Sequence, residues 1–173
     1  MRHFAILASL GRAIGSSLKY MLFVAFLIGV VAGLRSLTAP AVVAWGARLG
    51  WLQLENTPLA FMGSAASVIV FTLLAVAELV ADQLPSTPAR TAPPGLIARI
   101  VLGGLSGACV AAAGNLSLAA GACLGAAGGV AGAFGGYQAR TRLVRALAVR
   151  DLVIALLEDA VAIGAGLVLV SRF

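Results

Sequence analysis

One uncharged stretch limits what this chain can fold into: residues 100–139 contain no Asp, Glu, Lys or Arg. A soluble domain of ordinary size cannot hide so long an apolar run, whereas one transmembrane helix needs about 20 such residues. Gly114 and Asn115, near the middle of the run, are typical of a turn. The stretch therefore predicts two membrane helices joined by a short connection.

Other apolar stretches extend this prediction to the whole chain. Residues 56–77 and 152–170 are each long enough for a crossing. The first continues as a helix to Asp82, and the second is interrupted by Glu158 and Asp159. Of the 173 residues, 61% are hydrophobic and 10% are charged, which excludes an ordinary soluble domain. We therefore expect an all-α, polytopic transmembrane helical bundle.

The first membrane segment is interrupted. Residues 20–34 and 36–47 are uncharged, Arg35 separates them and Pro40 follows closely. One kinked helix, two short tilted helices or a re-entrant hairpin would each satisfy this pattern, provided that protein buries the irregular backbone. We expect five to six membrane segments, with a broken or re-entrant first hairpin.

Proline and charge divide the chain. Residues 84–95 are rich in proline, and we interpret them as a cytoplasmic linker. The other divisions are a basic, amphipathic N-terminal segment and two membrane halves: residues 1–19, 20–83 and 96–173. The net charge is +6. The positive-inside rule predicts that loops 84–95 and 138–150 lie on the cytoplasmic side of a bacterial inner membrane. No nucleic-acid partner is expected, because the basic residues stand at the ends of apolar runs without interleaved aromatic residues.

A weak internal similarity suggests two inverted halves. The Gly-Val-Val-Ala-Gly of residues 29–33 resembles the Gly-Gly-Val-Ala-Gly of residues 128–132, and an acid-bearing helix follows each. Inverted repeats are a recurrent plan of secondary transporters, whose sites lie between the repeats. The alternative is that such strings recur by chance in a membrane protein rich in Ala and Gly.

Acidic residues inside membrane segments are the main functional candidates. An Asp at the centre of a membrane helix costs about 2.5–3.5 kcal/mol, so we expect these acids to face the bundle interior. Glu78 and Asp82 are four residues apart and share one helix face. We predict an ion or proton pathway of Glu78, Asp82, Glu158 and Asp159, with Arg35 and Arg99 as balancing charges. The alternative is that these acids and arginines only pair to lock the helices together.

Two further sets of residues have mainly structural interpretations. Glycines four apart let helix backbones approach closely, either within the bundle or between two copies. The glycines in this pattern are Gly121, Gly125, Gly129, Gly128, Gly132 and Gly136. The basic cluster that follows can set the topology or hold lipid headgroups, and consists of Arg140, Arg142, Arg145 and Arg150.

The remaining reactive residues do not assemble an enzyme site. The single histidine, His3, and the two cysteines, Cys109 and Cys123, form no metal-ligand set, and metal binding is left undetermined. The sequence contains no Ser/His/Asp set and no Asp-x-x-Asp motif. We therefore predict no catalysis and no cofactor.

Several motifs together resemble a known family. They are Gly-Leu-Arg-Ser at residues 33–36, Glu-Leu-Val-Ala-Asp-Gln-Leu-Pro at 78–85, the loop through Pro-Pro-Gly at 93–95, Phe-Gly-Gly-Tyr at 134–137 and Leu-Leu-Glu-Asp at 156–159. Their order and spacing resemble the domain-of-unknown-function 4126 (DUF4126) family of small bacterial multi-pass membrane proteins. The resemblance covers the chain from about residue 24, implies a polytopic membrane fold and carries over no activity. More distantly, Glu-x-x-x-Asp is similar to the acidic signature of small cation/proton exchangers, from which it departs in spacing and at Gln83.

These observations lead to one functional prediction and two alternatives. We predict a small integral membrane channel or transporter for a small cation, with proton coupling as an option, that acts in a lipid bilayer as a homodimer. One alternative is a non-catalytic accessory or structural membrane subunit. The other is a lipid-binding membrane protein that holds headgroups at the basic cluster.

Overall fold

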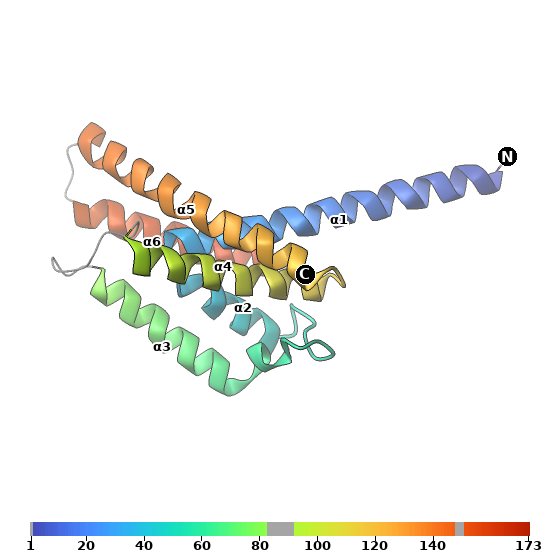
Figure 1. The fold of residues 1–173 in the computed structure, drawn as a ribbon, viewed down its shortest axis with the longest axis horizontal. Coiled ribbons are helices and arrows are strands. Elements are labelled where there is room, and N and C mark those ends of the chain that lie inside the picture. Colours follow the sequence, from blue (N-terminus) through green and yellow to red (C-terminus); the bar gives the residue numbers. More distant parts are fainter. Residues whose placement is uncertain (1, 83–91, 148–150) are drawn as a thin grey trace.

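The computed structural model describes residues 2–82, 92–147 and 151–173, and every regular element in these ranges is a helix (Figure 1). The elements are α1 (Arg2–Leu34), α2 (Thr38–Arg48), the 3-10 helix η1 (Ala60–Gly63), α3 (Ala65–Ala81), α4 (Pro93–Ala113), α5 (Leu118–Leu147) and α6 (Asp151–Val170). The all-α prediction is therefore confirmed for the described part of the chain.

Four of these helices are long and apolar enough to cross a membrane. The qualifying segments are Ser17–Leu34, Pro93–Ala113, Leu118–Ala146 and Val153–Val170. The shorter α3 has 17 residues, and α2 has 11. At 1.5 Å per residue α2 is about 16 Å long, roughly half the hydrocarbon thickness of a bilayer. The chain is a multi-pass membrane protein in which α2 does not span the bilayer by itself.

Element boundaries follow from local signals. The uncharged run 100–139 divides as expected, because α4 ends at Ala113 and Asn115 adopts the left-handed conformation (φ 55°) before α5. The predicted helix from residue 56 is wrong at its start. Residues 60–63 form η1 instead, and the Ser64 side chain caps α3 by accepting a hydrogen bond from the Ser67 backbone N–H.

The first membrane segment is a broken hairpin. α1 ends at Leu34, and α2 turns back along the bundle toward the end where both chain termini lie (Figure 1). The α1–α2 break lies at the opposite end of the bundle, together with the C-terminal end of α3 and the N-terminal end of α4 (Figure 1). The three non-helical residues between α1 and α2, residues 35–37, rule out one continuous kinked helix.

Helices α1, α4 and α5 pack through their glycines. A Cβ added to Gly103 would lie 2.7 Å from the Gly125 carbonyl oxygen, and one added to Gly107 would lie 2.8 Å from the Gly125 Cα. On another face of α5, a Cβ on Gly132 would lie 2.9 Å from the Gly33 Cα of α1. Contacts this short mean that backbone touches backbone, as in small-residue packing of membrane helices. These glycines therefore pack helices of the same chain against one another.

The resemblance between residues 29–33 and 128–132 does not reflect an inverted repeat. Gly128 meets Gly29 and Gly132 meets Gly33, so the contact register advances in the same direction along α1 and α5. The two helices run parallel, whereas segments related by inversion cross the membrane in opposite directions. The acid-bearing α3 and α6 do run in opposite directions (Figure 1).

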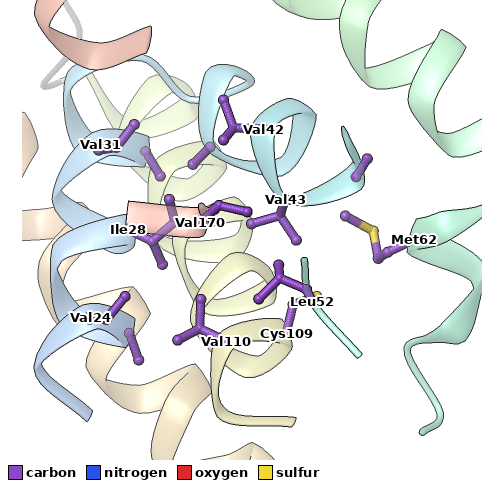
Figure 2. Close-up of a cluster of buried hydrophobic side chains, with 14 of the residues drawn as sticks. Val24, Ile28, Val31, Val42, Val43, Leu52, Met62, Cys109, Val110 and Val170 are labelled. Carbon is purple, nitrogen blue, oxygen red and sulfur yellow. The ribbon is translucent and has the colours of Figure 1, made fainter. Parts of the chain in front are cut away.

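An apolar core joins α2 to the glycine-packed helices. Val24 and Ile28 of α1, Val43 of α2 and Val110 of α4 are almost completely buried around Val170 at the end of α6 (Figure 2). Met62 of η1 and Leu52 close this core toward the connection between α2 and α3 (Figure 2). The core fixes α2 against the bundle and thereby positions the break that precedes it.

Candidate functional site: a charged cluster at the α1–α2 break

The buried break between α1 and α2 creates a demand for polar partners. Ending one helix and starting another leaves the last carbonyls of α1 and the first N–H groups of α2 without helical partners. In hydrocarbon each unsatisfied group costs several kcal/mol. Pro40, in the first turn of α2, reduces the demand because its missing N–H would have had no helical partner.

Glu78 of α3 caps the start of α2. Its Oε1 accepts hydrogen bonds from the Ser36 backbone N–H (2.9 Å) and the Ser36 hydroxyl (2.6 Å), and its Oε2 accepts one from the Leu37 N–H (2.8 Å). No side-chain hydrogen bond from the N-cap residue of α2 takes this role. A carboxylate at a helix N-terminus also interacts favourably with the helix dipole. Glu78 therefore supplies from another helix the cap that α2 lacks.

Arg99 of α4 binds the other side of the break, at the C-terminal end of α1. Its Nε donates to the Gly33 carbonyl near the end of α1, and one terminal nitrogen donates to the Gly95 carbonyl, both at 3.0 Å. The other terminal nitrogen lies 4.0 Å from Glu78 Oε1. A cation is favourable at a helix C-terminus. Arg99, with 5% of its surface exposed, therefore caps α1 and faces the carboxylate that caps α2.

Arg35 lies inside the break and joins it to two further helices. Its guanidinium is fully buried and pairs with Asp82 at the end of α3 and with Asp159 in the middle of α6. The Nε of Arg35 donates to Asp159 Oδ1, and a terminal nitrogen donates to Asp82 Oδ2. The side chains of Asp82 and Asp159 keep 18% and 11% of their surface exposed. One arginine thus links the break to α3 and α6.

Together these residues form what we call the charged cluster: Glu78, Asp82, Asp159, Arg35 and Arg99. It holds three carboxyl groups against two guanidinium groups, so with all of them ionised its net charge is −1. The chain matches the family model for Domain of unknown function (DUF4126) over residues 22–171, a range that contains the whole cluster. The protein belongs to the DUF4126 family. No curated protein and no solved structure matches it significantly.

In this DUF4126 protein the predicted site residues separate into two places. Three of the four predicted acids and both balancing arginines meet in the charged cluster. The fourth acid, Glu158, lies apart from them: its Oε2 is 3.8 Å from a terminal nitrogen of Arg140 on α5. Adjacent helical residues point about 100° apart, which directs Glu158 and Asp159 to different neighbours.

The basic cluster of the DUF4126 chain is also divided. Arg140 is half-buried and pairs with Glu158, whereas Arg142 and Arg145 are exposed on the last turns of α5. Arg150 and most of the linker 84–95 lie outside the described residues. Among the described residues, no group of three or more His, Cys, Asp or Glu side chains is arranged to hold a metal ion.

Sequence reasoning missed the polar groups of residues 33–37 that complete the cluster. The Ser36 hydroxyl, the Leu37 N–H and the Gly33 carbonyl each bind a charged side chain more than 40 positions away in the sequence. The available signal was the coincidence of Gly33, Ser36 and Pro40 around a buried arginine. That pattern marks a helix break, and a membrane helix break needs charged or polar caps.

Proposed function

We propose that this DUF4126 protein is a small membrane transporter or channel for protons or a small monovalent cation, and that the charged cluster is its binding site. The observation that carries the proposal is that, among the residues the structure describes, the charged cluster brings three carboxyl groups together with two arginines. An unbalanced buried charge is costly, so binding one proton or one cation stabilises the cluster.

The geometry favours Asp82 and Asp159 as the groups that bind the proton or cation. Glu78 receives three hydrogen bonds from the α2 N-terminus and its Ser36 hydroxyl, which hold it as a fixed anionic cap. Asp82 and Asp159 share a single guanidinium, and their side chains are largely buried but not sealed from the surface. If either carboxylate is neutralised, Arg35 keeps one anionic partner instead of two.

The loss of one anionic partner of Arg35 also provides a way to couple binding to the movement of a helix. Arg35 connects the break to both α3 and α6, so neutralising Asp159 weakens the link to α6 while leaving the link to α3. Broken helices that line binding sites are a recurrent device of transporters, in which such sites open alternately to the two sides. We propose that loading of Asp159 is coupled to a shift of α6 relative to the break.

Proton or cation flux in proteoliposomes tests this proposal. Purified protein is reconstituted with an internal pH indicator, and uptake is driven by a potassium diffusion potential, with sodium or potassium gradients applied in parallel. Asp159→Asn and Asp82→Asn are expected to reduce flux at least tenfold. The matched control is Glu55→Gln, an exposed acid in the connection between α2 and α3, which should leave flux unchanged. Wild-type flux no higher than that of empty vesicles would reject transport.

A second candidate function is a non-catalytic structural or accessory subunit of a larger membrane complex. The observation in its favour is that each acid of the charged cluster also has a partner within the chain, so the cluster serves to hold the break together. A partner protein that copurifies in fixed stoichiometry, combined with absence of flux, would support this candidate. We also keep the homodimer as a proposal, to be tested by mass measurement in detergent.

A further inference from the structure

The short helix α2 leaves a groove on the surface of the bundle. One face of α2, from Thr38 to Trp45, forms its floor, α3 forms one wall from Thr72 to Leu79, and Ile163 and Leu167 of α6 form the other. The groove holds about 210 Å³. Its lining is almost entirely apolar, and the indole N–H of Trp45 already donates to the Thr72 hydroxyl (3.1 Å). An apolar occupant therefore fits, and a polar one does not.

The surroundings of the groove place it against lipid. Leu73 and Leu74 of α3 and Val168 of α6 are large apolar side chains with at least two-fifths of their surface exposed. An acyl chain is thinner than a helix, which is about 10 Å wide, and it adapts to the curvature of a surface groove.

One end of the groove carries positive charge. Trp45 lies in the last turns of α2, and Arg48 ends this helix. Val170, at the end of α6, lies where a Cβ of Gly46 would stand, so Arg172 follows close to the same end of α2. Both arginines are exposed, and so is Glu55 in the following connection. An exposed tryptophan beside arginines is typical of the membrane interface, where phosphate headgroups lie.

We propose that the groove between α2, α3 and α6 binds one acyl chain of an anionic phospholipid, and that Arg48 and Arg172 bind its phosphate. Arginine pairs with phosphate through charge-assisted hydrogen bonds, which gives this lipid an advantage over a zwitterionic one. The two arginines lie at the opposite end of α2 from the charged cluster, whereas the Thr38 and Leu79 end of the groove adjoins the cluster. The proposal does not rest on the proposed transport.

Quenching of Trp45 fluorescence by brominated lipids tests the site. Trp51→Phe makes Trp45 the sole tryptophan of the chain. The protein is reconstituted in phosphatidylcholine vesicles that contain a small, equal fraction of either phosphatidylglycerol or phosphatidylcholine with brominated acyl chains. Brominated phosphatidylglycerol is expected to quench Trp45 more strongly than brominated phosphatidylcholine does, because it is enriched in the groove.

Two double variants distinguish a specific headgroup site from a general attraction of anionic lipid to a basic protein. Arg48→Gln with Arg172→Gln should lower the preference for phosphatidylglycerol by about fivefold per arginine. The matched control, Arg142→Gln with Arg145→Gln, changes two exposed arginines of α5 and should leave the preference unchanged. Equal quenching by the two lipids, or equal effects of the two arginine pairs, would overturn the proposal. Quenching by neither lipid would show that another occupant covers the groove and would overturn it as well.

Discussion

The two sides of this bundle are held together by different forces. Helices α1, α4 and α5 meet through glycines, with backbone atoms in direct contact. Helices α3 and α6 are linked to the α1–α2 break by carboxylates that pair with one buried arginine or cap α2. Glycine packing has no side chain that can change state, whereas carboxylates can bind a proton or a cation. The first side is therefore suited to be a rigid support, and the second to be the part that responds.

The largest effect is expected from enlarging a glycine between α4 and α5. Gly125→Val would drive its side chain into the backbone of Gly103 and Gly107, and no flexible side chain is there to move aside. The expected loss exceeds about 5 kcal/mol, at the extreme of single substitutions, so folded protein should not be recovered. Size-exclusion chromatography in detergent measures this. Gly135→Val, on the same helix with open space around it, is the control and should fold normally.

The second largest effect is expected from removing the cation inside the break. Arg35→Met leaves Asp82 and Asp159 buried without their common partner, which costs about 3–5 kcal/mol. Thermal unfolding in detergent should show a much lower midpoint. Adding Asp82→Asn and Asp159→Asn to Arg35→Met should recover most of the loss, because the uncompensated charges are then gone. Failure of that triple variant to recover stability would mean that Arg35 acts through packing and not through charge.

The third effect is local to the start of α2. Glu78→Ala removes the acceptors for the Ser36 and Leu37 N–H groups, and loss of such a cap costs at least about 1–2 kcal/mol. Hydrogen exchange should become faster at these two amides while amides in the middle of α5 keep their protection. Glu78→Gln, which keeps one carbonyl acceptor, should lie between the wild type and Glu78→Ala. Unchanged exchange at Ser36 in Glu78→Ala would contradict the capping role.

The same comparison explains what could be predicted from the sequence. The run that became most of α4 and α5 was recognisable because absence of charge over about 20 residues per helix has one main explanation, a membrane helix. The run that became α6 was recognisable because it is apolar over a similar length apart from Glu158 and Asp159. The break at Arg35 was also visible in outline, since this charged residue interrupts the apolar sequence and Pro40 follows closely. The start of α3 was misplaced because Phe61 and Met62 are as apolar as a membrane helix but belong to η1.

The partners of the charged residues were beyond sequence reasoning. Arg35 and Asp159 are separated by 124 positions, and no local pattern indicates that they meet. Glu78 resembled Asp82 because the two share a helix face, yet it caps α2 while Asp82 pairs with Arg35. Residue type and spacing identified charged residues that are largely buried in the bundle. The assignment of each acid to a cap or to an ion pair required the tertiary arrangement.

The smallest effect is expected at the ion pair outside the cluster. Arg140 and Glu158 link α5 to α6 across 3.8 Å, a distance at the limit of an ion pair, and the Arg140 side chain keeps 20% of its surface exposed. Partly hydrated pairs of this kind contribute about 1 kcal/mol or less. A double-mutant cycle with Arg140→Gln and Glu158→Gln, followed by thermal unfolding, should give a coupling energy in that range and leave flux unchanged. A coupling energy several times larger would mean that this pair is as strong as the ion pairs of the charged cluster. The part of the bundle that responds to a proton or cation would then extend to α5.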